Sequence, residues 1–428
     1  MPATIQAVYR QFNPTEPLEA GDPRYVDCNQ VRGIPSIFEQ LSLPLLDPPP
    51  RTLLFSGHIG DGKTTLLKQL AERLEREDHF VAFAQADNLL DLADVDVEDV
   101  ILLILVAVDQ RLRERYGATL QDSRLQQRLK EVWELLNREL SPNKIEVNTL
   151  LVKLTADMKV VKGIRQELRA RLRMMQGPTF LEVANECLDH ARQIIKKNNK
   201  QQLVVIFDGF DRMIGRGRTP DVSMEQRLLL DQASRLSSIE VHVIYTASLS
   251  LARRQHENLR ARYGQSPIIV PLIPVLKRDG QPNPKGLEAL KEVIAKRLEQ
   301  ADMTREQAFD TEATVERLCQ VNGGYLRGLL ALVRAVCAEA LAVHSDLPLT
   351  TADAEAAIQR LGAQLRDNAR PYHKELQAVL DTHTLAEVDD IKQQLLLDQH
   401  LVYHYYENGD YWYDVCEPVK EQLSGRSS

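Results

Sequence analysis

The sequence predicts an α/β protein with a parallel sheet, followed by an all-helical segment and a C-terminal module of helices and a hairpin. Short apolar runs alternate with helical patterns in the earlier part of the chain, as they do where sheet strands run parallel. From residue 286 onward helical patterns follow one another directly. Asn408-Gly409 then separates two aromatic, β-prone runs, which predicts a hairpin. The five expected strands lie at 52–56, 78–85, 202–207, 240–246 and 267–274.

These patterns divide the chain into successive domains. An N-terminal arm and linker helix (1–50) precede the sheet-containing core (51–280), and three prolines in a polar stretch predict that residues 1–33 are extended. The core contains a helical insertion at about 121–200, for which a coiled coil is the rival interpretation, although no a/d heptad persists. A helical lid (281–365) and a winged-helix-like domain (366–428) complete the chain.

The composition excludes several classes of protein. With 43% hydrophobic and 27% charged residues over 428 positions, the chain has enough apolar material for two or three globular domains. Its five cysteines are scattered without C-x-x-C spacing, which argues against a disulfide framework or zinc site. The longest apolar run, 100–108, is too short to span a bilayer, and the first residues lack a signal-peptide pattern. We therefore expect a cytoplasmic protein without membrane contact.

Residues Gly57–Thr64 fit the pattern G-x-x-x-x-G-K-[ST] of a phosphate-binding loop. An apolar strand precedes the loop and a helical pattern follows it, so backbone N–H groups and a helix N-terminus can surround an anion. Lys63 is expected to reach the β- and γ-phosphates, and the Thr64 hydroxyl to bind Mg²⁺. The residues predicted to hold the nucleotide here are Gly57, His58, Ile59, Gly60, Asp61, Gly62, Lys63, Thr64 and Thr65.

A second set of candidates follows the strand at 203–207, which ends in Asp208. An acid in this position beside a phosphate loop holds Mg²⁺, usually through water. Hydrolysis also needs a carboxylate that orients or deprotonates the attacking water, and Asp211 is the nearest candidate. A cap, or a salt bridge to Arg212, is the alternative role for Asp211.

The phosphate loop and the Asp208-Gly209-Phe210-Asp211 stretch together resemble the STAND branch of signalling P-loop NTPases, relatives of the AAA+ and origin-recognition ATPases. The resemblance implies ATP and Mg²⁺ as ligands. Gly209 stands where many AAA+ members have glutamate, which implies slow or regulated hydrolysis.

Three further positions match this family. Thr246 matches the strand-end residue that senses the γ-phosphate, with a plain strand-end hydroxyl as the alternative. Arg327 matches the lid arginine that touches the phosphates, with a solvated helix arginine as the alternative. The segment 25–33, with Arg32 and Gly33, resembles the linker that lines the adenine pocket.

The charge of the chain indicates which kinds of partner it can bind. The net charge is −8, and the segment 371–428 has four Lys or Arg against eleven Asp or Glu, which disfavours DNA as its partner. The insertion is basic over 159–173, where a solvated helix face competes with a nucleic-acid or partner contact. In oligomeric relatives an arginine reaches the neighbour's γ-phosphate. Candidates for that role are Arg253, Arg254, Arg260, Arg262 and Arg297, each with a plain basic helix face as its alternative.

Together these observations predict an ATP-binding regulatory ATPase, a molecular switch whose ATP or ADP state controls self-association or a protein partner. The resemblance implies roles of the kind found in bacterial signalling and phage defence. The alternatives are a DNA-associated AAA+ ATPase of the origin-recognition or transposition-regulator type, and a nucleotide-binding scaffold with negligible hydrolysis.

Overall fold

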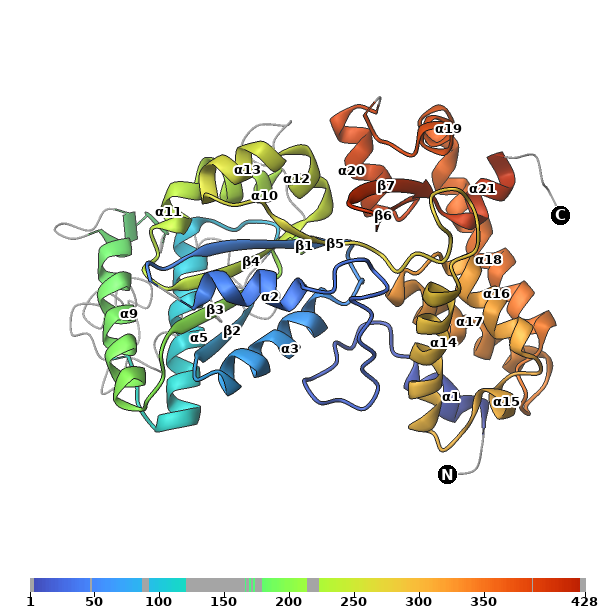
Figure 1. Ribbon diagram of the computed structural model, residues 1–428, viewed down its shortest axis with the longest axis horizontal. Coiled ribbons are helices and arrows are strands. Elements are labelled where there is room, and N and C mark those ends of the chain that lie inside the picture. Colours follow the sequence, from blue (N-terminus) through green and yellow to red (C-terminus); the bar gives the residue numbers. More distant parts are fainter. Residues whose placement is uncertain are drawn as a thin grey trace, which may run out of the picture. The chain divides into compact units, whose positions relative to one another are not determined.

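The computed structural model describes residues 4–46, 48–86, 92–120, 166, 169–170, 172–173, 179–213, 223–386 and 388–423. It contains two compact units, which are coloured along the sequence in Figure 1. Unit 1 comprises Met1–Ile37, Gly57–Gln69 and Ile269–Ser428, and unit 2 comprises Phe38–Ser56 and Leu70–Ile268. The predicted phosphate loop therefore belongs to the same unit as the lid and the C-terminal module.

A five-stranded sheet in the order β2-β3-β4-β1-β5 forms the α/β core. Its strands are β1 (Thr52–Gly57), β2 (Phe80–Gln85), β3 (Leu203–Asp208), β4 (His242–Ser248) and β5 (Ile268–Val270). The β2–β3 and β3–β4 pairs are parallel. All six residues of β3 are buried, so side chains on both faces of the sheet are covered, as continuous apolar strands require. The predicted α/β class is confirmed.

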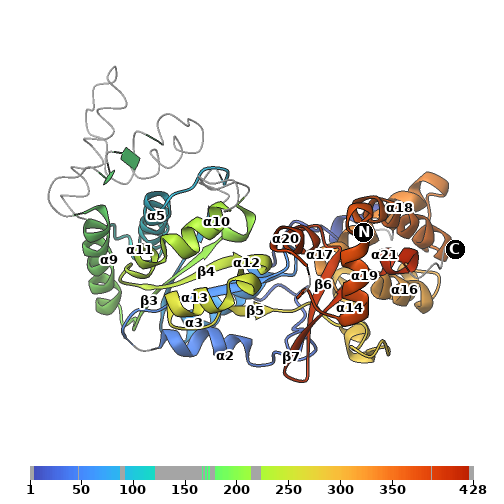
Figure 2. The ribbon, with the colours of Figure 1, turned by 90° about the horizontal axis from the view of Figure 1, so that it is seen from above.

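Two long helices cover one face of this sheet. Helices α5 (Val97–Tyr116) and α9 (Phe180–Lys197) share one hydrophobic core with alternate residues of β3, and they lie side by side in Figures 1 and 2. Asp96 caps α5 in a capping box with Asp99, and Gly117 ends it in the left-handed conformation. The other α-helices described between residues 37 and 263 are α2 (Ile37–Ser42), α3 (Lys63–Arg76), α10 (Met224–Gln226), α11 (Ala233–Ser237), α12 (Leu249–Arg254) and α13 (His256–Tyr263).

Most of the predicted insertion at 121–200 lies outside the described residues, apart from α9 and a few positions before it. Two of those positions belong to the basic stretch. Arg169 is buried and pairs with Asp99 and, at 2.8 Å, with Asp94, while Arg173 lies 2.8 Å from Glu98. The solvated face expected from the sequence is wrong for Arg169, because the acidic start of α5 neutralises it inside unit 2.

Unit 1 contains the helical lid and the C-terminal module. The lid helices are α14 (Pro284–Glu299), α15 (Arg305–Ala308), α16 (Glu312–Asn322), α17 (Leu326–Val343) and α18 (Thr351–Ala369). They are followed by α19 (His373–Thr382), α20 (Asp390–Asp398), β6 (Val402–Glu407), β7 (Asp410–Val415) and α21 (Glu417–Leu423). The hairpin is confirmed, with positive φ at Asn408 and Gly409. The domain boundaries and the winged helix stay predictions. Within the described ranges, no helix is both long and apolar enough to cross a membrane.

The N-terminal arm is not wholly extended, contrary to the expectation for 1–33. Helix α1 (Ile5–Gln11) is capped by Thr4 and places Ile5, Val8 and Phe12 in the hydrophobic core of the lid. These three apolar residues share one face of the helix, so tertiary burial stabilises a segment too short to be helical by itself. The N-terminus is thereby anchored to α17 and α14.

Gly324, which precedes α17, has φ +86°, and a Cβ there would lie 1.8 Å from the carbonyl oxygen of Ile273. We predict that Gly324→Ala lowers the free energy of unfolding by about 2–5 kcal/mol, from left-handed strain and overpacking together. Gly264→Ala is the matched control, because Gly264 has φ +74° with nothing within 4 Å of an added Cβ. It is expected to cost about 1–2 kcal/mol. Equal midpoints in denaturant unfolding would show that the close approach to Ile273 costs nothing.

Candidate nucleotide-binding site

The phosphate loop joins the end of β1 to the first turn of α3, as the motif predicts. Gly60 and Gly62 have φ of +88° and +87°, which an L-residue rarely adopts. A Cβ on Gly60 would also lie 2.8 Å from the hydroxyl of Tyr325 and 2.7 Å from the Cβ of Arg327. The glycines of the motif are therefore required both for the loop conformation and for its close approach to the lid.

Lys63 and Thr64 occupy the start of α3. The ammonium of Lys63 is buried and donates to the carbonyl oxygens of Gly57, at 3.0 Å, and His58, at 2.9 Å. The ammonium is thus held by the backbone of the loop, and its predicted contact with phosphate stays a prediction. Thr64 is also buried at the helix N-terminus, and Ile59 is partly exposed on the loop.

Arg32 of the N-terminal arm holds the loop from another side. Its Nη1 donates to Oδ2 of Asp61 at 2.8 Å and to the Pro271 carbonyl at 3.1 Å, and its Nη2 donates to Oδ1 and the backbone oxygen of Asp61. Both side chains are almost fully buried. The bidentate geometry fixes the orientation of both groups. The next residue, Gly33, has φ +81° and lies against the ring of Tyr406 in the hairpin.

The environment of Asp61 sets its charge. Burial raises the pKa of this carboxyl to about 7, and the positive charges of Arg32 and Lys63 act in the opposite direction. Since its pKa is higher in the folded than in the unfolded protein, the contribution of Asp61 to stability falls as the pH rises toward 7. Arg32 thus holds an acid that the interior otherwise disfavours in its ionised form.

The lid contacts the same loop through Arg327. The backbone N–H of Arg327 donates to the carbonyl of Gly60 at 3.1 Å. Its side chain turns to the N-terminal arm, where Nε donates to the Pro14 carbonyl at 3.2 Å. The structure therefore brings the predicted lid arginine to the loop; its contact with phosphate stays a prediction.

The hairpin contacts the loop through His58. The backbone N–H of His404 in β6 donates to Nε2 of His58 at 3.1 Å. The two rings of His58 and His400 lie 5.8 Å apart, and His400 stacks on Tyr325 of the lid at 4.2 Å. Burial lowers the pKa of His58 well below 6.5, so the ring stays neutral and Nε2 can accept the hydrogen bond. Loop, lid and hairpin meet at this cluster.

The N-terminal arm also lies along the first turns of α3. The backbone N–H of Leu18 donates to the Thr65 hydroxyl at 3.1 Å, and the Gln69 amide donates to the Glu19 carbonyl at 3.2 Å. The Glu19 carboxylate pairs with Lys68. Thr65, predicted to contact the nucleotide, thus has an arm residue as its hydrogen-bond donor.

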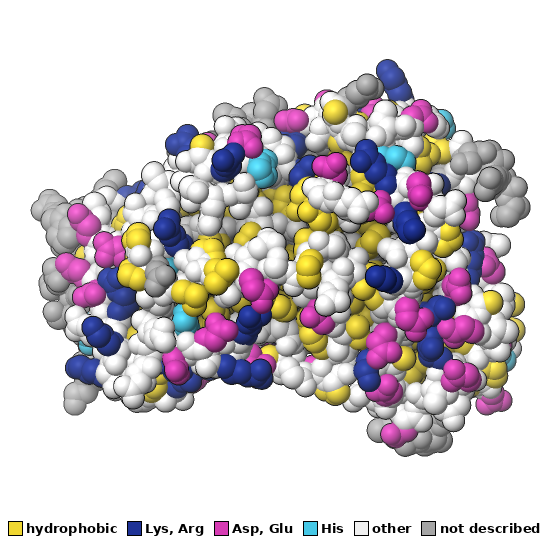
Figure 3. Space-filling model, viewed as in Figure 1, with side chains coloured by type: hydrophobic (Ala, Val, Ile, Leu, Met, Phe, Trp, Pro, Cys, Tyr) yellow, Lys and Arg dark blue, Asp and Glu magenta, His cyan; other side chains and the backbone are white. Residues whose placement is uncertain are grey.

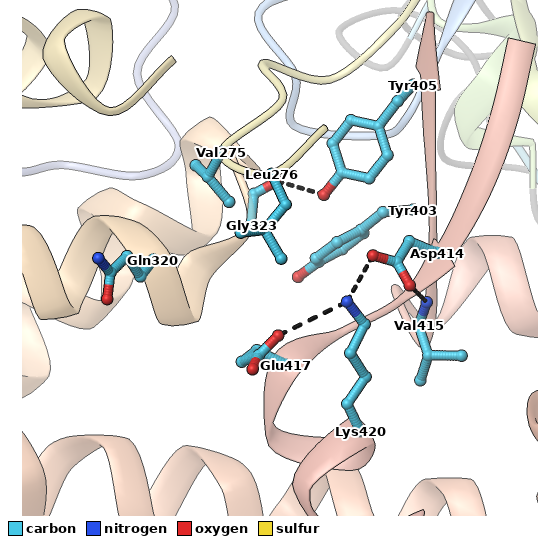
Figure 4. A pocket seen from close by; sticks show the side chains of 10 residues that line it. All are labelled: Val275, Leu276, Gln320, Gly323, Tyr403, Tyr405, Asp414, Val415, Glu417 and Lys420. Carbon is cyan, nitrogen blue, oxygen red and sulfur yellow. Dashed lines mark hydrogen bonds and ion pairs between the residues drawn. The ribbon is translucent and has the colours of Figure 1, made fainter. Parts of the chain in front are cut away.

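The hairpin is also hydrogen-bonded to the lid. Figure 4 shows a pocket between the end of α16 and the hairpin, in which the Tyr405 hydroxyl points at Gly323 and donates to its carbonyl at 2.6 Å. Lys420 of α21 reaches Asp414 and Glu417 on the other side of the pocket. The Tyr405 hydrogen bond holds the C-terminal module to the residues that precede α17, and the ion pairs of Lys420 join α21 to the hairpin within the module.

Three predicted residues, Asp208, Asp211 and Thr246, belong to unit 2. Asp208 is buried at the end of β3, 3.8 Å from the guanidinium of Arg212. The backbone N–H of Gly209 donates to the Thr246 hydroxyl at 2.8 Å, and that hydroxyl donates to Asp211 at 3.5 Å. The structure therefore joins Asp211 and Thr246 directly. Their catalytic and sensing roles stay predictions.

The remaining arginine candidates differ in exposure. Arg260 is exposed and pairs with Glu257, whereas Arg297 is buried and donates to the Val293 carbonyl within α14. An exposed arginine can reach a neighbouring molecule and a buried one cannot. Of these two, only Arg260 has the exposure that a trans-acting role requires.

In the part of the chain that the structure describes, no three His, Cys, Asp or Glu residues lie close enough together to bind a metal ion by themselves. Mg²⁺ does not need such a cluster, because one or two protein oxygens suffice when phosphates and water complete its shell. Thr64 and Asp208 have the donor chemistry for this role and stay its predicted ligands.

Sequence comparison identifies no relatives: no family model and no curated protein matches the chain. Solved structures do align along most of it. The Aeropyrum pernix ORC1 protein in complex with DNA is 13% identical over 97% of this chain and 96% of that chain, with a TM-score of 0.42. The A. pernix ORC2 protein in ADPNP–ADP complexes is 16% identical over 97% of this chain and 98% of that chain, with a TM-score of 0.42. The Thermotoga maritima RuvB Holliday junction branch migration motor is 13% identical over 94% of this chain and 98% of that chain, with a TM-score of 0.38. Similarity at this level transfers no activity to the chain.

We predict that Arg32→Ala lowers the free energy of unfolding by about 3–5 kcal/mol, because it leaves a buried carboxylate without its partner. The double variant Arg32→Met, Asp61→Asn removes both charges and is expected to cost clearly less. Urea unfolding at neutral pH measures both. If the double variant lost as much stability as the single one, the ion pair would not be the cause.

Proposed function

We propose that this protein is an ATP-binding molecular switch with slow or regulated ATPase activity. The observation that carries the proposal is the set of hydrogen bonds from the phosphate loop to two other parts of unit 1. The Gly60 carbonyl accepts from the Arg327 backbone in the lid, and the His58 ring accepts from the His404 backbone in the hairpin. A change in the conformation of the loop would therefore act directly on the lid and on the hairpin.

A phosphate loop of this type binds through its backbone N–H groups, so its conformation depends on what it holds. Any nucleotide that favours one loop conformation also favours the lid and hairpin positions that fit it. By linkage, the docking of the lid and the hairpin must then alter nucleotide affinity by the same factor. This reciprocity is what a switch needs.

Hydrolysis resets such a switch. In the proposed reaction Asp211 orients the attacking water and Thr246 senses the γ-phosphate. Thr64 and Asp208 would hold Mg²⁺, which would supply positive charge to the phosphates. The hydrogen bond between Thr246 and Asp211 supports a shared role for these two residues. Gly209 in place of a glutamate supports slow turnover.

The output of the switch is proposed to be self-association or the binding of a protein partner, in a signalling or phage-defence setting. DNA is the less favoured partner, since the segment 371–428 has four basic against eleven acidic residues. Acidic and basic side chains are interspersed over the lid helices on the face shown in Figure 3. Charged side chains of the lid also pair with one another, as Lys291 does with Glu312 and Glu316.

Lys63→Ala tests the site. We predict at least a hundredfold loss of ATP affinity in calorimetric titration, because the loop loses the charge that faces the phosphates. Arg76→Ala is the matched control: it removes the same charge from an exposed position at the end of α3, and it is expected to bind ATP like the native protein. Retention of ATP affinity by Lys63→Ala would refute the assignment of the loop.

A further inference from the structure

Glu225 in α10 is a buried acid to which the proposed reaction gives no role. It is 6% exposed, and both of its carboxylate oxygens bind Ser248. Oε1 accepts from the Ser248 backbone N–H at 2.5 Å, and Oε2 accepts from the Ser248 hydroxyl at 2.6 Å. Hydrogen bonds to a carboxylate are about twice as strong as those between neutral groups. Two of them to one residue fix the orientation of both side chains.

Ser248 is the residue at which β4 ends, directly before α12. Its hydroxyl donates to Glu225 and also accepts from the Leu251 N–H at 3.2 Å, as the N-cap of α12. A serine in this position satisfies one of the N–H groups that have no partner within the first turn of a helix. Glu225 therefore holds both the end of the strand and the cap of the helix that follows it.

The backbone that carries Glu225 is itself held in place. A π-helical turn, Arg227–Asp231, directly follows α10, and the side chain of Leu229 in this turn is buried in the core of unit 2. The Tyr263 hydroxyl of α13 donates to the Leu229 carbonyl at 2.9 Å. π-Helical turns are rare and occur frequently at functional sites. Glu225 thus reaches Ser248 from a backbone that is packed and hydrogen-bonded.

Thr246 precedes Ser248 by two residues in β4. Because side chains alternate between the faces of a strand, these two lie on the same face, about 6–7 Å apart along the strand. The Thr246 hydroxyl accepts from the Gly209 N–H at 2.8 Å and donates to Asp211 at 3.5 Å. A shift of the strand end at Ser248 would therefore also move the hydroxyl that contacts Gly209 and Asp211.

We propose that Glu225 is a positioning residue for ATP hydrolysis, which holds the end of β4 so that Thr246 keeps its place beside Asp211. This inference rests on the proposed function, in which these two residues serve the γ-phosphate and the attacking water. Glu225 acts through Ser248 and not on the nucleotide. Its loss is therefore expected to slow hydrolysis and to leave ATP affinity unchanged, because the phosphate loop belongs to unit 1.

The first test measures ATP turnover by the full chain at saturating ATP and Mg²⁺, with ATP affinity measured by calorimetric titration. Glu225→Ala is expected to lower kcat roughly 10- to 100-fold, the effect of a displacement of about 1 Å near the reacting groups, without a change in affinity. Glu225→Gln still has one oxygen that accepts and an NH₂ that donates, so it should retain more of kcat. In the double variant Glu225→Ala, Ser248→Ala the loss should be smaller than the product of the two single losses, because the side chains form one contact.

Asp109→Ala is the matched control. Asp109 is also a buried acid of unit 2, and it accepts from the Leu120 N–H at 2.8 Å and from Arg113. Its loss is expected to lower the thermal midpoint as Glu225→Ala does, while kcat stays at the native value. A kcat that fell equally in both variants would show that Glu225 only stabilises the fold, and would overturn the proposal.

Hydrogen exchange of the Gly209 amide tests the inference without ATP. This N–H donates to Thr246, so its protection reports on the end of β4. In the ligand-free protein, Glu225→Ala should raise its exchange rate by about tenfold or more, while amides of α9 exchange as in the native chain. Unchanged Gly209 protection, or a native kcat in Glu225→Ala, would overturn the role of Glu225 and leave the proposed function standing. If the native protein had no turnover, the ATPase activity and the positioning role would fail together.

Discussion

The buried ion pair between Arg32 and Asp61 ties the N-terminal arm to the phosphate-binding loop, and the other contacts of that loop are arranged around it. Arg32 donates to both carboxylate oxygens, to the backbone of Asp61 and to Pro271, so it fixes the loop against two segments at once. Lid and hairpin then add backbone hydrogen bonds to Gly60 and His58. The loop is a shared element of three parts of unit 1, and this supports its proposed role in transmitting nucleotide state.

Several polar groups that the proposed function assigns to the nucleotide have protein partners in this structure. Lys63 donates to two loop carbonyls, Thr65 accepts from Leu18, and the Arg327 side chain donates to Pro14. The N-terminal arm is thus hydrogen-bonded to one side chain of α3 and one of the lid. In the proposed function, nucleotide binding and the position of the arm are linked through Thr65 and Arg327, since a phosphate contact by either residue would compete with its hydrogen bond to the arm.

Local patterns predicted what depends on local sequence. The strand, loop and helix around Lys63 follow from the motif, and the hairpin follows from Asn408-Gly409. Strand β5 is shorter than the expected 267–274, since Pro271 and Pro274 have no N–H to donate. Helix α1 was missed because only its burial against the lid makes a seven-residue segment helical.

The long-range contacts of the site carried no signal in the sequence. Arg32 and Asp61 are 29 residues apart, and His58 and His404 are 346 apart. The linker resemblance places Arg32 near adenine, which stays a prediction; its engagement with the loop through Asp61 has no signal in the sequence. The sequence does not reveal His400 and Tyr403 as neighbours of His58, because aromatic residues near a hairpin ordinarily indicate packing. Charge and aromatic content alone do not specify which pairs meet.

The most direct test follows the backbone N–H of His404, which reports on the hydrogen bond between hairpin and loop. Residue-resolved hydrogen exchange of this amide is measured without nucleotide, with ADP and with ATP, each at saturation. Coupling between loop and hairpin predicts that its protection differs between the ATP and ADP states, while amides of α9 in unit 2 exchange alike in all three. Identical exchange of the His404 amide in the three states, with ATP and ADP both shown to bind, would contradict the account.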